Sequence, residues 1–270
     1  NRNPNIEYAE PNFIVQAQLT PNDTYYPKQW ALPKISAPTG WDITTGSSSA
    51  VIAIVDSGID INHEDLQSKL TGTPDVDECG HGTLVSGVAA AATNNSKGIA
   101  GVCWQCLMLS IKVLNSSCTG SDSSVASGIV RAADQGAKVI NLSLGSSANS
   151  SSIANAVNYA WGKGVVLVAA SGNSPTVPIM MYPAAFDNVI AVGGITSSDG
   201  RVSTSNYGPW LDVVAPGYIV LTTLRGNNYG PQAGTSVASP HVAGLAGLIL
   251  SANPGLSNQQ VFDIITQTAD

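Results

Sequence analysis

Charged side chains are scarce in this sequence. Lys, Arg, Asp and Glu make up 11% of its 270 residues, whereas about 25% is usual in globular proteins. Eighteen carboxylates outnumber eleven Lys and Arg side chains, and the formal net charge is −7. This balance repels nucleic-acid phosphates and anionic lipid, so we expect neither nucleic acid nor a membrane as a partner.

Long hydrophobic runs are lacking as well. The most apolar stretch, Val242 to Leu250, is far shorter than the roughly 18 to 20 residues that span a bilayer. The opening residues, NRNPNIEYAEPN, contain no apolar segment of the kind that directs export. If the protein is exported, we expect that such a segment was removed upstream of this numbering.

Cysteine occurs only four times. Cys103 and Cys106 form a CxxC motif, but the apolar run LMLSIKVL follows it, whereas a redox motif would begin a helix. A zinc site would need a second ligand pair, and only Cys79, Cys118 and three His are available. Structural disulfides are the favoured interpretation, free thiols and a metal site remain alternatives, and disulfides would indicate an oxidising compartment.

Five short apolar runs alternate with helical segments. Runs of this kind are typical of strands buried on both faces of a parallel sheet, and they cover residues 50–55, 109–114, 138–144, 165–170 and 188–193. Helices are expected over 83–92, 125–135, 153–162 and 236–250, and Ser257 with Gln260 predicts a capping box that begins a last helix. The alternation predicts an α/β fold with a doubly wound, mostly parallel sheet and helices on both faces. Ligands bind beyond the carboxyl ends of such strands.

Three polar residues at the ends of predicted strands and helices are of the types that nucleophilic catalysis requires. Asp56 ends the first strand in IVDSG, His81 lies between glycines in CGHGT, and Ser236 begins the most apolar helix in GTSVASPHVAG. Each alone has an ordinary interpretation, as a turn residue, a surface histidine or a helix cap. Together they supply a hydroxyl, a base to remove its proton and a carboxylate to orient the base.

The choice of base follows from the positions of the three histidines. His241 lies five residues after Ser236 on the same expected helix and cannot easily reach back to its hydroxyl. His63 lies in the polar turn INHEDL, away from any strand end. His81 is therefore the best candidate for the base.

These segments resemble the subtilisin family of serine proteases. AIVDSGI, GHGT and GTSVASPHVAG are similar to its three signature blocks in the order Asp, His, Ser, with Val237 where Met is common. INLSLG and VAASGN resemble its substrate-binding strand and oxyanion loop, while TPND, NNSKGIAG and AADQGAKVI are similar to thermitase-like members. The resemblance extends from about Thr20 to Asp270.

The resemblance implies a secreted, monomeric serine endopeptidase that acts on polypeptides through an acyl-enzyme. Ser236 would attack the scissile carbonyl, His81 would be the general base and Asp56 would orient it. Asn173 would donate its side-chain amide to the oxyanion, beside the backbone N–H of Ser236.

The resemblance also implies two walls of a substrate cleft. The primary specificity pocket would be lined by Ser143, Leu144, Gly145, Ala170, Ser171 and Gly172. The opposite wall, along which an extended substrate would lie, would be formed by Cys118, Thr119 and Gly120. A pocket with glycine and no acidic base favours a large apolar side chain before the scissile bond.

The stretch AATNNSKGIAG resembles the family's calcium loop. Carried over by position, the ligands are the side chains of Asp23, Asp65 and Asn95 and the carbonyls of Ala92, Lys97 and Ile99. Six oxygens suit Ca²⁺ rather than Zn²⁺, and the ion would be structural rather than catalytic. The segment from Asp65 to His81 is shorter than in thermitase-like members, so no second calcium loop is expected there.

Related enzymes have a bridge that joins the same two loops as Cys79 and Cys118. The resemblance therefore implies a Cys79–Cys118 disulfide, with Cys103 and Cys106 forming a local one. The resemblance also divides the chain into two parts. Residues 1–19 are similar to the tail of a subtilase propeptide, which inhibits the enzyme and aids its folding, and residues 20–270 form the catalytic domain. Cleavage is expected within about residues 17–20. The chain stops at QTAD, where members continue to a closing segment, so a truncated C-terminus remains open.

Two other interpretations fit the sequence less well. An esterase or lipase of the α/β-hydrolase type would carry GxSxG and the order Ser, Asp, His, and no GxSxG occurs in the chain. A member of the family that has lost its chemistry would lack a catalytic position, and all four are present.

Overall fold

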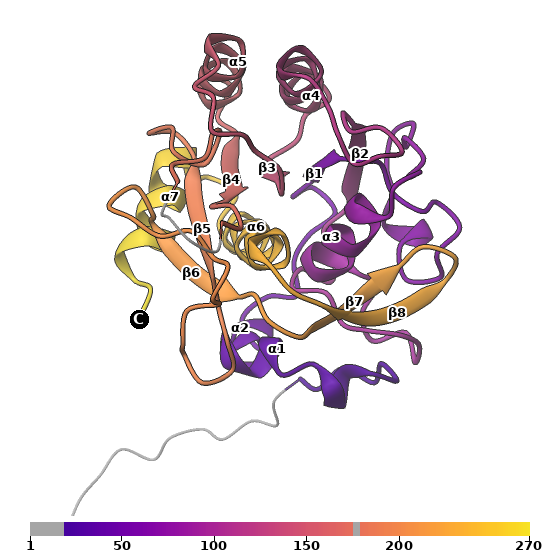
Figure 1. The fold of residues 1–270 in the computed structure, drawn as a ribbon. Coiled ribbons are helices and arrows are strands. Elements are labelled where there is room, and N and C mark those ends of the chain that lie inside the picture. The colour runs from indigo at the N-terminus through magenta and orange to yellow at the C-terminus, as the bar shows by residue number, and fades with distance from the viewer. Residues whose placement is uncertain (1–18, 175–178) are drawn as a thin grey trace, which may run out of the picture.

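A parallel β-sheet forms the centre of the computed structural model, which describes residues 19–174 and 179–270 (Figure 1). The strand order is β2-β1-β3-β4-β5-β6, and every neighbouring pair is parallel. The strands are β1 (Ile52–Asp56), β2 (Met108–Lys112), β3 (Val139–Leu142), β4 (Val166–Ala170), β5 (Ile190–Ile195) and β6 (Val213–Pro216). The expected α/β fold with a doubly wound sheet is confirmed.

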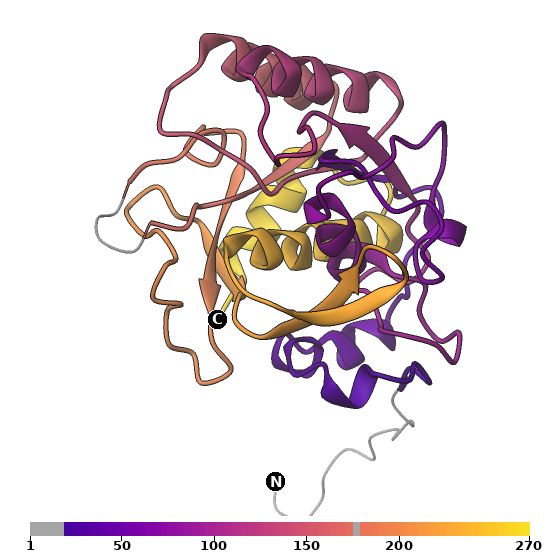
Figure 2. The ribbon, with the colours of Figure 1, turned by 45° about the vertical axis from the view of Figure 1, so that its right-hand side comes forward.

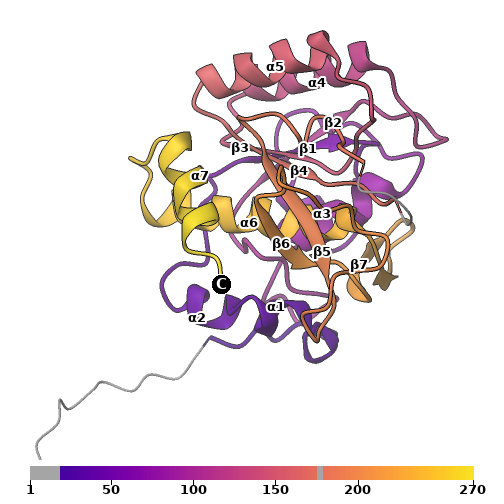
Figure 3. The ribbon, with the colours of Figure 1, turned by 60° about the vertical axis from the view of Figure 1, so that its left-hand side comes forward.

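Helices cover both faces of this sheet (Figure 3). On one face lie α4 (Asp122–Asp134) and α5 (Ser151–Gly162), and on the other lie α3 (His81–Ala90) and α6 (Thr235–Ala252). The chain ends with α7 (Asn258–Gln267), whose expected capping box forms between Ser257 and Gln260. Near the start of the described chain are α1 (Ala31–Lys34) and α2 (Ala37–Trp41), with 3₁₀ turns η1 (Tyr26–Lys28) and η2 (Gln67–Lys69).

Strand β1 shows how the sheet divides the core. Ile52 and Ile54 pack in the cluster on the α3 and α6 side, whereas Ala53 and Val55 pack in the cluster on the α4 and α5 side. All four are fully buried, which explains why the sequence reads as a continuous apolar run instead of an alternating one. The strand is thereby fixed from both faces, and so is the residue that ends it.

Helix α6 is the most apolar helix, and it runs beneath the sheet. By length and mean hydropathy (1.3) it is able to cross a membrane, but 67% of it is buried inside the protein. Contacts with α3 and with β3, β4, β5 and β6 account for that burial. We therefore interpret α6 as a core helix.

Three strands were not predicted from the sequence. Strand β6 lies at the edge of the sheet, and β7 (Val220–Leu224) and β8 (Asn228–Gln232) form an antiparallel hairpin beside α3 (Figure 2). The hydroxyl of Thr222 donates to the carbonyl of Leu84 at 2.6 Å, and that of Thr223 donates to the carbonyl of Thr83 at 2.7 Å. The hairpin thus holds the first turn of α3 from outside.

Two helical glycines give opposite predictions for the same substitution. A Cβ at Gly244 in α6 would lie 2.6 Å from Cβ of Val102 and 2.8 Å from the carbonyl oxygen of Ala89, whereas a Cβ at Gly162 in α5 meets nothing within 4 Å. We expect Gly244→Ala to lower the free energy of unfolding by about 1–3 kcal/mol through overpacking. Gly162→Ala should raise it by about 0.5–1 kcal/mol. Guanidinium denaturation followed by circular dichroism measures both, and changes of equal sign would contradict this account of the α3–α6 contact.

Candidate active site

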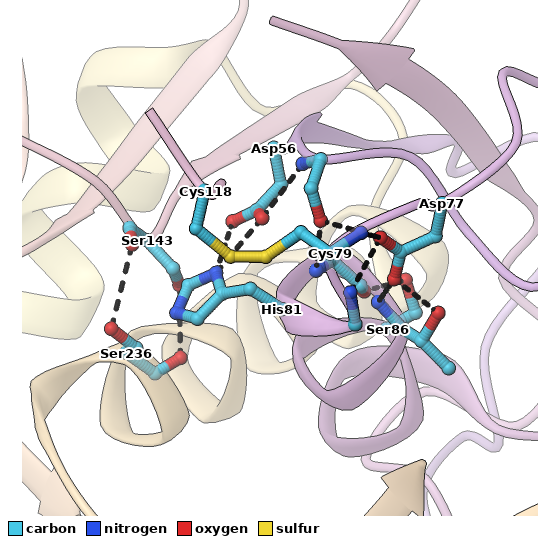
Figure 4. Close-up of polar contacts among 12 residues, drawn as sticks. Asp56, Asp77, Cys79, His81, Ser86, Cys118, Ser143 and Ser236 are labelled. Carbon is cyan, nitrogen blue, oxygen red and sulfur yellow. Dashed lines mark hydrogen bonds and ion pairs between the residues drawn. A yellow bond between two sulfur atoms is a disulfide. The ribbon is translucent and has the colours of Figure 1, made fainter. Parts of the chain in front are cut away.

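Asp56 and His81 meet where β1 ends and α3 begins (Figure 4). The Asp56 carboxylate is fully buried, and both of its oxygens lie within hydrogen-bond distance of Nδ1 of His81, at 2.8 and 2.9 Å. The backbone N–H of Ser57 donates to the same carboxylate at 2.8 Å. Because Nδ1 faces a carboxylate, it carries the ring proton, and Nε2 keeps its lone pair.

The close approach of α3 to β1 depends on a glycine. A Cβ at Gly82 would lie 2.0 Å from the carbonyl oxygen of Gly58 and 3.3 Å from Cβ of Asp56. A larger residue would push the first turn of α3 away from the strand. The GHGT motif therefore contains both the imidazole and the small residue that lets it reach Asp56.

Electrostatics favour the charged form of His81. Burial alone would lower its pKa, but the charge and hydrogen bond of Asp56, with a smaller contribution from the charge of Asp77, raise it above the ordinary value. The ring is neutral, and able to accept a proton, only at a pH above that raised pKa.

Ser236 is the second residue of α6, and Figure 4 shows the imidazole of His81 between Asp56 and Ser236. Two hydrogen bonds fix its position: its Oγ donates to the carbonyl of Ser143 at 3.4 Å, and its carbonyl accepts from Oγ of Ser143 at 2.9 Å. Because Ser236 lies in the first turn of α6, the helix dipole favours negative charge near it. Among the described residues no hydrogen bond joins this Oγ to His81; hydrogen bonds of this kind often form only when substrate binds.

Asn173 follows β4 and faces the same helix terminus. Its Oδ1 accepts from the backbone N–H of Thr235 at 2.9 Å and from the Thr235 hydroxyl at 3.2 Å. These two bonds orient the carboxamide and leave its Nδ2 donor end for another acceptor. A Cβ at Gly234 would lie 3.2 Å from Nδ2, so the bare glycine preserves space around that donor.

A recess opens beside Ser236 and Asn173. It is lined by Ser143, Leu144, Gly145, Ala170, Gly172, Asn173, Met181, Thr235 and Ser236. Every residue expected in the specificity pocket is present except Ser171, which is fully buried and donates its hydroxyl to the carbonyl of Asn206 at 3.4 Å. Met181 and Thr235 were not predicted, because neither belongs to a motif quoted for the pocket.

A longer groove continues from this recess past His81. The expected wall residues Cys118, Thr119 and Gly120 line it, together with Ser143, Leu144 and Gly145 and with side chains that the sequence did not indicate, among them Leu114, Asp122 and Tyr182. The two expected walls therefore belong to one cleft.

The four cysteines are joined as Cys79–Cys118 and Cys103–Cys106, the pairs that were expected. The Cα–Cα distances are 5.5 and 5.4 Å, within the range that disulfides require. The first bridge joins the loop before His81 to the wall of the groove (Figure 4).

The region expected to hold calcium contains two buried aspartates. Asp23 accepts the N–H of Asn94 on Oδ2 at 2.8 Å, while its Oδ1 is buried without a hydrogen-bond partner. Burial raises the pKa of Asp23, and the nearby charge of Asp65 adds a smaller increase. A hard cation would relieve both the missing partner and the repulsion, so this carboxyl pair fits Ca²⁺.

The neutral ligands fit less completely. Asn95 donates Nδ2 to Oδ1 of Asp65 at 2.9 Å, and its own Oδ1 accepts the N–H of Lys97 at 2.8 Å. The N–H of Ile99 donates to Oδ2 of Asp65 at 2.9 Å. No group of three or more His, Cys, Asp or Glu residues converges anywhere in the described ranges, so any ion here must take its ligands beyond the two carboxylates from carbonyl and amide oxygens.

Known proteins are similar to this chain in sequence and in fold. The family model described as "Subtilase family" matches residues 47–270. The thermophilic serine proteinase of Bacillus sp. (strain AK1) is 46% identical over 279 residues, which cover 100% of this chain and 69% of that protein. Thermitase of Thermoactinomyces vulgaris is 48% identical over 261 residues, or 93% and 92% of the two chains. A solved protease structure from Pseudoalteromonas arctica superposes with a TM-score of 0.85 at 32% identity and covers 93% of each chain.

Peptide mapping tests the cysteine pairs. Native protein alkylated without reduction and then digested should yield one peptide pair containing Cys79 and Cys118, and no alkylated Cys79. Because 39 positions separate the two cysteines, replacing both by alanine should lower the free energy of unfolding by about 3–4 kcal/mol. Finding Cys79 alkylated, or joined to Cys103, would overturn the pairing.

Proposed function

The chain belongs to the subtilase family and is a subtilisin-like serine endopeptidase, and from that premise we propose that Asp56, His81 and Ser236 form its catalytic triad. The observation that carries the proposal is the contact of both Asp56 oxygens with Nδ1 of His81, at 2.8 and 2.9 Å, beside the helix terminus that presents Ser236. This contact sets the tautomer in which Nε2 of His81 is a base.

The reaction proceeds in two halves. Nε2 of His81 takes the proton of Ser236 as Oγ attacks the scissile carbonyl carbon. The resulting tetrahedral intermediate collapses when His81 passes this proton to the leaving amine. A water then attacks the acyl-enzyme with His81 again as base, and the acid product leaves with Ser236 restored. Asp56 stays ionised throughout and stabilises the transient imidazolium.

The oxyanion is stabilised by two donors, Nδ2 of Asn173 and the backbone N–H of Ser236. Thr235 supports the first donor because its N–H, at 2.9 Å, holds the opposite end of the carboxamide. Removing one such donor costs about 3–4 kcal/mol of transition-state stabilisation, a magnitude established for a subtilisin.

Specificity follows from the recess beside Ser236. None of the residues that line it is charged, and Met181 gives it an adaptable apolar wall. A large apolar side chain before the scissile bond is therefore favoured over Lys or Arg. The preceding substrate residues lie extended in the groove between Thr119 and Leu144.

A structural Ca²⁺ would be held by the side chains of Asp23, Asp65 and Asn95 and by the carbonyls of Ala92, Lys97 and Ile99. The unpartnered Oδ1 of Asp23 supports this assignment. The ion would compensate the charge of two buried carboxylates and would tie the N-terminal segment to the loop after α3. It would take no part in the triad.

We also propose that the enzyme is a secreted monomer made with an inhibitory propeptide. A relative from Natrialba magadii that is 41% identical is named as an extracellular serine protease, and disulfides suit an oxidising compartment. The propeptide tail proposed for residues 1–19 lies almost wholly outside the described residues.

Replacing the nucleophile tests the triad. Ser236→Ala should lower the kcat for casein hydrolysis by a factor on the order of 10⁶, the loss known for a subtilisin without its nucleophile. The matched control is Ser251→Ala at the far end of α6, which loses only a hydrogen bond to the carbonyl of Gly247 and should keep its kcat. Pure Ser236→Ala protein should also stay uncut, whereas active enzyme should begin near residues 17–20. Casein hydrolysis by Ser236→Ala at the control's rate would refute the triad.

A chelator tests the calcium proposal. EDTA should lower the temperature of thermal inactivation and speed autolysis, while the initial rate on a small peptide barely changes, because binding to the native state alone stabilises by about 4 kcal/mol at a thousandfold excess over Kd. Asp23→Asn and Asp65→Ala should reproduce that loss and remove most of the further effect of EDTA.

The control for these variants is Asp212→Asn. Its carboxylate also accepts one backbone N–H, from Ala191 at 2.7 Å, but no calcium ligand is proposed there. This variant should keep the full response to EDTA. Immediate loss of turnover in folded wild-type enzyme would mean that the metal is catalytic.

A further inference from the structure

We infer that Asp77, acting with Ser57, positions His81 for the proposed triad. Asp77 belongs to none of the family motifs quoted above, and it does not line the recess or the groove. The inference rests on the proposed role of His81. It concerns what holds the imidazole in place and not which groups react.

The Asp77 carboxylate is 1% exposed and accepts five hydrogen bonds (Figure 4). Its Oδ1 accepts from the N–H groups of Cys79 and Gly80, at 2.9 and 2.7 Å, and from the hydroxyl of Ser57 at 2.8 Å. Its Oδ2 accepts from the N–H of Thr83 at 3.1 Å and from its hydroxyl at 2.5 Å. The donors lie on both sides of His81 in the chain, so the carboxylate clamps the backbone that carries the imidazole.

Helix α3 needs a remote cap because its own cap position has no side chain. That position is Gly80, with φ of 105°, a conformation that glycine adopts without strain. The first N–H groups of a helix have no partner within the helix. Asp77 takes the N–H of Thr83, and Oγ of Ser57 takes the N–H of Gly82 at 2.8 Å. The cap is thus supplied from outside the helix, to the two residues that directly follow His81.

Ser57 connects this cap to the other half of the proposed triad. Its hydroxyl donates to Asp77 and accepts from Gly82, while its backbone N–H donates to Asp56 at 2.8 Å. The backbone of Asp77 is held in turn by a hydrogen bond to the carbonyl of Ile59 at 3.1 Å. One continuous network therefore fixes the carboxylate of Asp56 and the start of α3 relative to each other.

Asp77 also contributes charge. Charged groups near His81 include Asp56 from β1 and Asp77 and Glu78 from the preceding loop. Asp122 on α4 lies across the groove, and Arg225 of the β7–β8 hairpin packs on Gly80 and donates to the carbonyl of Glu78. The negative charge of Asp77 favours the imidazolium. Its removal should therefore extend activity to lower pH, even where the maximum rate falls.

Two substitutions separate the clamp from the charge. Asp77→Asn keeps the shape but replaces one acceptor by a donor that faces N–H groups, so kcat should fall about ten- to a hundredfold. Its KM should stay within about twofold, and the acid limb of kcat/KM should move to lower pH. Ser57→Ala breaks the same network without changing a charge, so its kcat should fall while the acid limb stays at the wild-type pH. Rates on a chromogenic peptide are divided by active sites titrated with a serine-directed inhibitor.

Ser86→Ala is the control within the same helix. Ser86 is fully buried and donates its hydroxyl to the carbonyl of Gly82 at 2.7 Å, so its loss should lower the unfolding temperature and leave kcat per titrated site unchanged. The inference is overturned if Asp77→Asn keeps the wild-type kcat and acid limb, or if Ser57→Ala keeps the wild-type kcat. If Asp77→Asn does not fold, Ser57→Ala decides alone. An active His81→Ala enzyme would instead refute the proposed triad itself.

Discussion

The contact between Asp56 and His81 is the interaction on which the rest of this structure depends. A fully buried carboxylate is unstable unless other groups compensate its charge, and Asp56 receives one imidazole and one backbone N–H. Its carbonyl oxygen accepts two further N–H groups, from Val113 and Leu114 at 2.7 and 3.1 Å. Asp56 thus joins β1, the start of α3 and the chain that leaves β2. A displacement of any of these segments would expose or isolate the charge.

The parallel sheet explains why functional groups from distant parts of the chain meet. Ser143 follows the end of β3, Asn173 follows β4, and Asp56 ends β1, so the carboxyl ends of three neighbouring strands point to one edge. Ser236 reaches this edge from the face of the sheet that α3 and α6 cover, because the N-terminus of α6 lies at this edge. The hydrogen bonds of Ser143 to Ser236 and of Asn173 to Thr235 connect the ends of the strands to the start of α6. The cleft is therefore a property of the fold's topology, and the loops only line it.

The sequence predicted the elements whose pattern is local. Strands β1 to β5 are continuous apolar runs, but β6 is an edge strand with a half-exposed Val214, and β8 contains Gly230 and Pro231, which do not resemble a strand. The proposed triad could be named from the sequence because its residues lie in motifs. Asp77 could not, because rules for helix caps look for a side chain at the cap position, which here is a glycine. Met181 enters the recess only through tertiary packing, for which no local pattern exists.

Four buried aspartates show how a chain with few charges compensates those that it buries. Asp77 has five donors, and Asp56 has an imidazole as well as an N–H. Asp65 accepts from Asn95, Ile99 and the hydroxyl of Tyr229, the last at 2.9 Å. Asp23 alone keeps one oxygen without a donor, and the charge of Asp65 lies near it. Protein donors thus suffice at the two carboxylates beside His81. Only the pair that joins the N-terminal segment to the loop after α3 keeps an oxygen without a donor, and this is the place where we propose an outside cation.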